Sequence, residues 1–332
     1  MSANHPSFHI LVTGGAGYIG SITTAALIEA GYQVTVLDNL ATGYREAIHP
    51  EARFFKGDIS DPTIIQSICQ TGIDAVMHFA AFIEVGESVL NPSKYYHNNL
   101  VKSIRFFDAL IAGGVRHLVF SSTAAVYGDP EQIPLTEDNP LTPANPYGWS
   151  KMMVETVLKN YDMAYGFKYV SLRYFNAGGA KGPFGENHNP ESHLIPRILN
   201  AVIDNTPLEV FGTDYNTRDG SCIRDYIHVE DLAQAHILAM HYLLNGGKSE
   251  TFNLGTGTGY TVLEVIRTVE QIVGHSVSFI ASERREGDAP VLVAAPQKAR
   301  NILKWGVKLK SLDEIVRSAW EWKRVHPHGY TS

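Results

Sequence analysis

Residues 8–20, FHILVTGGAGYIG, join a short apolar run to a glycine cluster, and a stretch with helical spacing follows over residues 18–30. A glycine-rich turn between a strand and a helix brings backbone N–H groups and the helix N-terminus up to a pyrophosphate. We interpret Gly14 as the turn residue, Gly17 as the point of close approach, and Gly20 as the contact between helix and strand. The order therefore predicts a dinucleotide loop, although any tight strand-to-helix turn favours glycine.

The first half of the chain repeats this alternation of short apolar runs and helical stretches, which is typical of parallel βαβ units. The expected strands are residues 8–13, 33–37, 52–56, 74–79, 116–121 and 168–174, and the expected helices are 18–30, 62–70, 92–113 and 147–165. The pattern predicts an α/β protein with a doubly wound parallel sheet, the Rossmann arrangement that binds dinucleotides.

The composition of the sequence changes after Tyr174. The stretch NAGGAKGPFGENHNPES (176–192) is rich in Gly, Asn and Pro and too irregular for another βαβ unit, which predicts a functional loop. A further helix and strand, 228–244 and 251–254, return to the sheet. The expected division is a Rossmann domain and a smaller α/β region that binds the substrate. The first comprises residues 1–176, rejoined by about 222–255, and the second comprises 177–221 and 256–332.

Composition excludes several classes of protein. The 332 residues include 27 Lys and Arg against 34 Asp and Glu, a net charge of −7, and lack a basic stripe, so nucleic acid is not an expected partner. Cys69 and Cys222 have no metal-ligand spacing, which predicts a reducing compartment and no metal site. Because no 18-residue apolar run occurs, we expect a cytoplasmic protein without a membrane partner.

Asp38 ends the second expected strand, eighteen residues after Gly20, where an acid can accept hydrogen bonds from ribose hydroxyls and repel a 2′-phosphate. This position favours NAD over NADP, with a simple cap on the turn Asp38–Asn39 as the alternative. Asp58 follows the third strand and could contact the adenine amino group or cap a helix.

Tyr147 and Lys151 are four residues apart in PYGWSK, so both side chains share one face of the expected helix. Positive charge from Lys151 and an oxidised nicotinamide would favour the phenolate, which makes Tyr147 a candidate general base. The hydroxyl run that ends at Thr123 lies at the carboxyl end of its strand, where it could bond a reacting oxygen. A tyrosine and a lysine at this spacing can also be a plain surface pair, but here they share a chain with the glycine loop and Asp38.

Motifs along nearly the whole chain resemble the UDP-glucose 4-epimerases, members of the extended short-chain dehydrogenase/reductase family. They are GGAGYIG, LDN, GDI, HFAA, VGES, SSTAAVYG, NPYGWSK, RYFNAGGA, RDYIHVEDL, NLGTG and RREGD. The resemblance implies a retained NAD, transient oxidation of a UDP-hexose at C4 with Tyr147 as base, and return of the hydride to the opposite face. It also implies a homodimer, expected to pair through helices 92–113 and 147–165.

Carried over residue by residue, the resemblance implies three sets of site residues. The catalytic residues are Tyr147, Lys151 and Thr123. The cofactor-binding residues are Gly14, Gly17, Tyr18, Ile19, Gly20, Asp38, Asn39, Asp58, Ile59, Phe79, Ala80, Ala81, Asn98, Ser121, Tyr147, Lys151 and Tyr174. The substrate-binding residues are Ser122, Thr123, Tyr147, Phe175, Asn176, His193, Leu194, Phe211, Arg224, Arg285 and Asp288, with the arginines as diphosphate clamps.

Four positions depart from the family pattern. Thr123 stands where many members have serine, and Ile83 stands where some have a cofactor-contacting lysine, which puts NAD retention in doubt. His193 replaces an asparagine near the sugar. Leu292 is of intermediate size at a position that gates N-acetyl groups, and one or two methylenes shift such selectivity by only about 1–3 kcal/mol.

Two other hypotheses remain open at this point. A nucleotide-sugar dehydratase, decarboxylase or uronate epimerase would share the fold and the first oxidation, but Thr123 is followed by Ala124 and Ala125 rather than by the acid pair that elimination requires. A non-catalytic NAD-sensing regulator would keep the glycine loop, and the intact Tyr147 and Lys151 argue against it.

Overall fold

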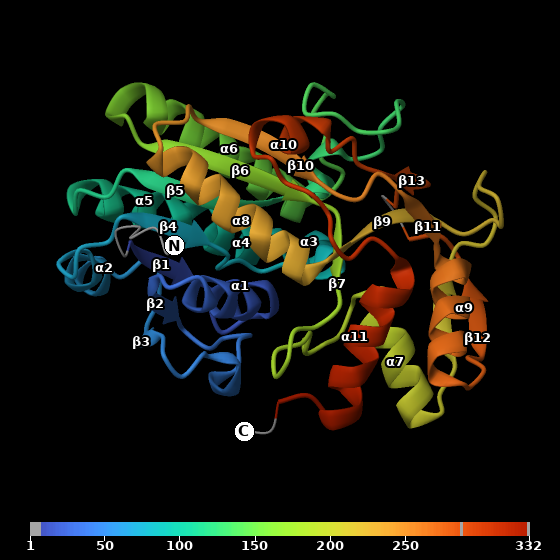
Figure 1. The fold of residues 1–332 in the computed structure, drawn as a ribbon. Coiled ribbons are helices and arrows are strands. Elements are labelled where there is room, and N and C mark those ends of the chain that lie inside the picture. Colours follow the sequence, from blue (N-terminus) through green and yellow to red (C-terminus); the bar gives the residue numbers. More distant parts are fainter. Residues whose placement is uncertain (1–7, 286–287, 331–332) are drawn as a thin grey trace.

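The computed structural model describes residues 8–285 and 288–330. Its centre is a parallel sheet of seven strands in the order β10-β6-β5-β4-β1-β2-β3 (Figure 1). The strands are β1 (His9–Thr13), β2 (Gln33–Asp38), β3 (Arg53–Lys56), β4 (Ala75–His78), β5 (His117–Thr123), β6 (Lys168–Tyr174) and β10 (Glu250–Leu254). The doubly wound α/β fold is confirmed. The strand order reverses between β1 and β4, the point at which such sheets bind ligands.

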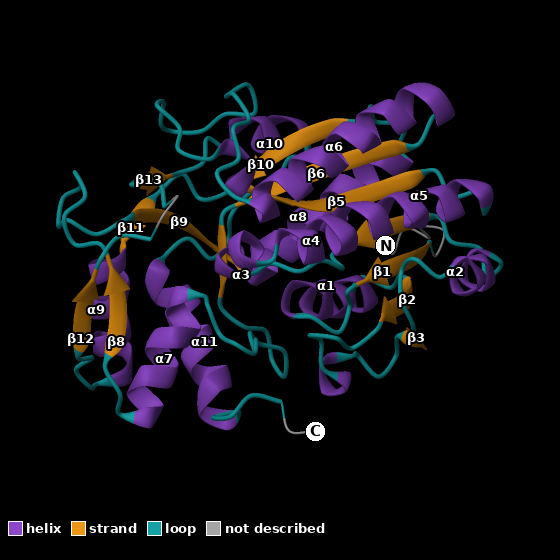
Figure 2. Ribbon diagram, turned by 180° about the vertical axis from the view of Figure 1, so that it is seen from behind, coloured by secondary structure: helices purple, strands orange, loops and turns teal. Residues whose placement is uncertain are grey.

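Helices cover both faces of the sheet and divide its side chains between two cores (Figures 1 and 2). One face carries α1 (Tyr18–Glu29) and α8 (Val229–Leu244), and the other carries α2 (Pro62–Cys69), α5 (Lys102–Ala112) and α6 (Pro146–Tyr165). Along β1, Ile10 and Val12 enter the first core while Leu11 enters the second. Such continuous apolar strands are what a sheet buried on both faces requires.

The helix expected over 92–113 is interrupted in the structure. It consists of α4 (Pro92–Tyr95), a π-helical segment η2 (Tyr96–Val101) and α5. Within that segment the Asn99 side chain accepts from Phe82 N at 2.9 Å and donates to Phe82 O at 3.0 Å. These two hydrogen bonds connect the chain after β4 to the π-helical turn. Such π-helical segments often occur at functional sites.

The smaller unit packs at the carboxyl edge of the large sheet (Figure 2). The sequence patterns did not resolve its strands, because they are only two to six residues long. They are β7 (Asn176–Gly178), β8 (Leu208–Phe211), β9 (Ile223–His228), β11 (Gly259–Thr261), β12 (Phe279–Ser282) and β13 (Val291–Leu292). Its helices are α7 (Leu194–Asp204), α9 (Val262–Val273) and α11 (Leu312–Val325), which share one apolar core with β8 and β9.

The chain passes between the two units several times. β9 pairs with β7, β11 and β13, so the chain rejoins the large sheet only from α8 onward. α10 (Gln297–Ile302) then packs beside β10. The remaining short elements are η1 (Arg45–Ala47), α3 (Val85–Leu90) and η3 (Ala124–Tyr127). Across the described ranges, no helix is both long and apolar enough to cross a bilayer.

Candidate active site

The glycine loop is shaped by contacts that a side chain would block. Gly14 has φ +72°, and a Cβ there would lie 2.7 Å from Ala80 N at the end of β4. A Cβ on Gly20 would lie 2.2 Å from Gly14 O, so Gly20 serves the closure of the loop itself more than the expected packing on the strand. A Cβ on Gly17 would meet only Gly14 O at 3.3 Å, so this side of the loop can receive a phosphate group. The loop fits a dinucleotide pyrophosphate at the N-terminus of α1.

Asp38, the last residue of β2, ties this loop to the strand. Its carboxylate accepts a hydrogen bond from Ala16 N at 3.0 Å and another from Leu40 N at 2.8 Å. Burial raises the pKa of this carboxyl, although the two backbone donors act to lower it. Each carboxylate oxygen has a second acceptor site, so ribose hydroxyls can be bound in addition to these local contacts. The turn-capping contact and the proposed ribose contact are therefore compatible.

Asp58 pairs with Lys102 at 2.6 Å and accepts from the Asn39 side chain at 3.4 Å. Burial acts to raise the pKa of Asp58, but Lys102 and Ser60 outweigh it and hold that pKa near 2. The helix cap considered for Asp58 is provided instead by Asp61, which accepts from the first N–H groups of α2. A carboxylate that stays ionised at the edge of β3 remains available to an adenine amino group.

The chain just after β4 lies against the glycine loop, because a Cβ on Gly14 would meet the backbone of Phe79 and Ala80. The ring of Phe79 packs against His236 at 4.7 Å, and Asn98 donates to Asn99 in the π-helical segment at 3.1 Å. The side chains of Tyr18 and Ile19 do not line the glycine loop as a cofactor contact would require. Both pack into a hydrophobic core, and the Tyr18 hydroxyl donates to Gly179 O at 2.6 Å. Ile59 is also a core residue, at 7% exposure. Any contact of these three with a cofactor would involve their backbone.

The carboxyl end of β5 and the start of α6 bring the predicted catalytic residues together. Asn145 caps α6, accepting from Gly148 N at 2.9 Å, so the helix presents its first turn to β5. The Thr123 hydroxyl, which accepts from Ala125 N at 3.1 Å, is close enough to the Tyr147 phenol to act on its pKa. Lys151, which is 3% exposed, donates from Nζ to Ser121 O at 2.8 Å. Tyrosine, threonine and lysine thus converge at the edge where the sheet binds ligands.

The electrostatics of this group differ from the expectation that Lys151 stabilises a phenolate. Burial raises the pKa of Tyr147 to about 12, the Thr123 hydroxyl acts to lower it, and Glu84 acts to raise it. Burial lowers the pKa of Lys151 to about 7, while Glu155 acts to raise it. The protein alone therefore keeps Tyr147 protonated. Forming the phenolate requires additional positive charge, which an oxidised nicotinamide would bring.

A buried polar network behind these residues was missed in the sequence. Glu155 forms an ion pair with Arg173 of β6 at 2.5 Å and accepts from Ser122 Oγ at 2.5 Å. Arg173 also donates to the Tyr127 hydroxyl at 2.9 Å. Ser122, predicted to touch substrate, is 1% exposed and directed into this network. The spacing of Glu155 four residues after Lys151 is the sequence signal that could have placed it behind the lysine.

A second hydroxyl pair flanks the catalytic group on the adjacent strand. Tyr174 at the end of β6 is hydrogen-bonded to Ser121 Oγ. Phe175 follows it and packs in a small core with Ala124, Tyr127 and Leu292. Leu292 on β13 thus lies close to the end of β5, which explains how its size could affect what fits beside the catalytic hydroxyls.

The predicted substrate contacts lie on the small sheet. Asn176 begins β7 and pairs with Tyr226 on β9, two positions from Arg224. Arg224 donates to Asp288 Oδ1 at 3.1 Å and to Ala289 O at 2.8 Å. The local Arg224–Asp225 salt bridge, considered as an alternative, is not the arrangement observed, because Asp225 accepts from Thr256, Gly257 and Ala294.

Two arginine side chains lie close to the ring of Phe211, the last residue of β8. The guanidinium of Arg285 lies 3.9 Å from the Phe211 ring centroid, and that of Arg197 lies 5.7 Å from it. Leu194 begins α7, and His193 precedes it, with Nδ1 at 2.6 Å from Glu186 Oε1. The small unit therefore places Arg197 on α7, Arg224 on β9 and Arg285 in the loop after β12, a composition suited to a diphosphate.

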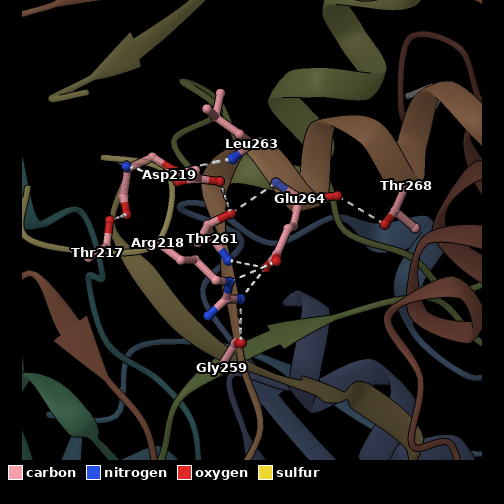
Figure 3. Close-up of polar contacts among 9 residues, drawn as sticks. Thr217, Arg218, Asp219, Gly259, Thr261, Leu263, Glu264 and Thr268 are labelled. Atoms are coloured by element: carbon pink, nitrogen blue, oxygen red, sulfur yellow. Dashed lines mark hydrogen bonds and ion pairs between the residues drawn. The ribbon is translucent and has the colours of Figure 1, made fainter. Parts of the chain in front are cut away.

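The turn before β9 is fastened to the start of α9, as Figure 3 shows. Arg218 donates to Glu264 Oε1 at 2.7 Å and to Gly259 O at 2.9 Å, while Asp219 accepts from the Thr261 hydroxyl at 2.5 Å. These contacts fix the entry into β9, on which Arg224 lies. A surface hollow beside them is lined in part by Arg218 and Glu264 and by none of the predicted site residues, so it belongs to this turn rather than to the active site.

Comparisons with known proteins agree with this geometry. Residues 10–255 match the NAD dependent epimerase/dehydratase family. A UDP-glucose 4-epimerase of Halalkalibacterium halodurans is 49% identical over 327 residues, which are 97% of this chain and 98% of that protein. A crystal structure of UDP-glucose 4-epimerase from Brucella ovis in complex with NAD is 43% identical, with a TM-score of 0.92, and the match covers 95% of this chain and 98% of that one. A Bifidobacterium longum UDP-glucose 4-epimerase in complex with NAD⁺ and UDP is 34% identical, with a TM-score of 0.92 and coverage of 97% and 100%.

The chain therefore belongs to the NAD dependent epimerase/dehydratase family. Within this family, its near full-length relatives are UDP-glucose 4-epimerases, which confirms the resemblance read from the motifs.

Proposed function

We propose that this enzyme is an isomerase that interconverts UDP-glucose and UDP-galactose at C4 of the sugar, with NAD as its cofactor. The observation that carries the proposal is the convergence of Tyr147, Thr123 and Lys151 at the same sheet edge as a glycine loop with room for a pyrophosphate. Relatives nearly half identical over almost the whole chain are UDP-glucose 4-epimerases, which supports the same reaction here.

Tyr147 takes the proton of the C4 hydroxyl when the sugar is oxidised and returns it when the keto sugar is reduced. NAD, when bound, supplies the positive charge that favours the phenolate and the site that accepts and returns the C4 hydride. Thr123 orients the hydroxyl through its own oxygen, and Lys151 holds the end of β5 against α6. Proton and hydride both return to the sugar, so the reaction has no net oxidation.

The reaction requires the sugar to present opposite faces to the cofactor while the nucleotide stays bound. We propose that residues 177–221 and 256–332 form the nucleotide-sugar region, and that Arg224, Arg285 and Asn176 anchor the UDP portion. The ion pair between Arg224 and Asp288 at 3.1 Å holds that guanidinium in place before substrate arrives. The hexose then needs few directional contacts of its own, which leaves it able to turn.

Arg285→Ala is expected to raise KM for UDP-galactose about 10- to 100-fold while kcat changes little, because a diphosphate anchor contributes equally before and during the chemical step. Steady-state kinetics measure both constants. The matched control is Arg284→Ala, since Arg284 pairs with Asp214 at 2.8 Å and should leave KM within about twofold. A fall in kcat at unchanged KM would contradict the anchoring role.

The proposed reaction is tested by giving the purified protein UDP-galactose without added NAD and following UDP-glucose by NMR. Conversion supports both the C4 reaction and a retained cofactor. Conversion only after NAD is added would support the reaction and show weak retention at the Ile83 position. Turnover would also exclude a purely NAD-sensing regulator. A 4-keto-6-deoxy product would indicate elimination, which we do not expect because Ala124 and Ala125 follow Thr123 where elimination requires an acid pair.

N-acetylated sugars are a second candidate substrate, and the size of Leu292 bears directly on whether they fit. Its side chain packs with Phe175 in the small core beside Thr123, so its size limits the space near the sugar. A Campylobacter jejuni UDP-Glc/GlcNAc 4-epimerase is 40% identical, with a TM-score of 0.83, and covers 96% of this chain. Running the same NMR assay with UDP-N-acetylglucosamine measures whether this chain also accepts the larger sugar.

We propose that two copies pair through the helices that include Val101 and Trp149. Both side chains are apolar and 38% exposed on adjacent segments, η2 and α6. Trp149→Glu is expected to convert a dimer into monomers in light scattering after gel filtration, because a buried unpaired carboxylate is costly. Ile302→Glu, on the exposed side of α10, is the control and should leave the dimer intact. A monomeric wild type would contradict the pairing.

We place this activity in the cytoplasm. Cys69 and Cys222 are both free thiols in the structure, which suits a reducing compartment. UDP-sugars would be the soluble partners of the enzyme there.

A further inference from the structure

We propose that the loop between β7 and α7 contains a binding site for one divalent transition-metal ion, best suited to Zn²⁺, formed by Glu186, His188, Glu191 and His193. Each residue offers one ligand atom, and all four atoms lie within 4.8 Å of one another. The site is separate from the predicted catalytic group on β5 and α6, and it gives His193, predicted above as a substrate contact, the role of a metal ligand. The cysteine spacing could not reveal it, because its ligands are imidazole nitrogens and carboxylate oxygens.

The distances between the ligand atoms fit a small ion. Glu186 Oε1 lies 3.5 Å from His188 Nδ1 and 2.6 Å from His193 Nδ1, while Glu191 Oε1 lies 3.7 Å and 3.8 Å from the same two nitrogens. A tetrahedral ion with bonds of about 2.0–2.2 Å sets its ligand atoms about 3.4 Å apart. Three of the four spacings are within a few tenths of an ångström of that value, and only the shortest must widen.

Burial supplies a second, independent observation. The Glu186 and Glu191 side chains are only 7% and 10% exposed. The Nδ1 atoms of His188 and His193 are both buried, and within the described part of the chain the Glu186 and Glu191 carboxylates are the only polar partners found for them. Two buried imidazole nitrogens directed at the same two carboxylates form a ligand set that a single cation can bind.

The donor set selects the class of ion. Two imidazoles and two carboxylates form a closed set of four ligands, typical of a structural zinc site. Mg²⁺ and Ca²⁺ prefer six or more oxygen ligands, which two carboxylates alone do not provide. Two carboxylates also neutralise the charge of a divalent ion.

The loop itself is arranged to hold these ligands. Glu191 accepts backbone hydrogen bonds from His188 N at 3.3 Å and from His193 N at 3.0 Å, so its carboxylate is fixed between the two histidines. The His188 ring packs edge-on against Tyr18 at 6.4 Å. Because Tyr18 begins α1 and His193 immediately precedes α7, an ion here would brace the starts of both helices.

Metal binding is tested on the full-length protein with its cofactor, first treated with EDTA, desalted and then titrated with ZnCl₂. We expect one zinc per chain by mass spectrometry of the metal and a rise in Tm of at least about 3 °C, because an ion that binds only the folded state stabilises it. Millimolar MgCl₂ should give no such shift. Wild-type protein that takes up no zinc would overturn the proposal and leave an ion-paired His/Glu cluster, and an equal shift with Mg²⁺ would overturn the choice of ion.

Variants locate the site. His188→Gln is expected to weaken zinc binding at least about 100-fold, whereas His275→Gln, an exposed histidine after α9, should bind as wild type does. Zinc bound equally by both would overturn the assignment. Should His188→Gln fail to fold, anomalous diffraction from wild-type crystals at the zinc edge decides. A peak among the four ligand atoms supports the site, and a peak elsewhere or none overturns it.

Discussion

Tyr147→Phe is expected to lower kcat by about 10²–10⁴-fold, the usual contribution of a general acid–base group, while NAD and UDP remain bound. Phenylalanine keeps the ring at the start of α6 and removes only the hydroxyl that Thr123 can reach. Burial already raises the pKa of Tyr147 to about 12, so the phenol can ionise and accept the sugar proton only when the positive charge of the cofactor is present. Turnover of UDP-galactose and the cofactor absorbance of the purified protein are the two measurements.

Tyr165→Phe is the matched control, because Tyr165 ends the same helix and is 55% exposed. It should retain wild-type turnover. If Tyr147→Phe turned over as fast as the control, the assignment of the general base would be wrong. Loss of bound NAD together with activity would instead indicate that the phenol mainly supports cofactor binding.

Gly20→Ala is expected to abolish most NAD retention and to lower the free energy of unfolding by about 1–3 kcal/mol, as overpacking of a close contact does. The added Cβ would lie 2.2 Å from Gly14 O and 2.9 Å from Gly14 C, so the phosphate loop must open to accommodate it. Cofactor content by absorbance and thermal unfolding measure the two effects.

Gly306→Ala is its control, since a Cβ there meets nothing within 4 Å. Its stability and NAD content should match the wild type. A Gly20→Ala protein with full NAD occupancy would show that the loop is not the cofactor's binding element.

The large sheet was predictable because its signals are local. Each strand from β1 to β6 is an apolar run of four to seven residues, and the helix starting at Pro146 carries its own cap in Asn145. The sequence pattern over residues 92–113 predicts one continuous α-helix. In the structure Asn99 binds the backbone of Phe82, and the helix has a π-helical turn at this position. That contact joins residues 17 apart and has no periodic signal.

The small unit and the buried network could not be derived in the same way. β13 has two residues, and β7 has three, so neither shows alternation. The spacing of Glu155 four residues after Lys151 could place it behind the lysine, but its pairing with Arg173 depends on the packing of α6 on β6 and has no signal in the sequence. The His/Glu loop was interpreted as irregular sequence around a sugar contact, because the convergence of its four side chains depends on the fold of the loop.

This enzyme is proposed to remove and return the hydrogen at C4 of one UDP-hexose without releasing it. The most direct test is incubation with UDP-galactose deuterated at C4, in ordinary water and without added cofactor, followed by NMR of the products. We expect UDP-glucose that retains the deuterium at C4. Product with protium at C4, or no UDP-glucose even after NAD is added, would contradict the proposal.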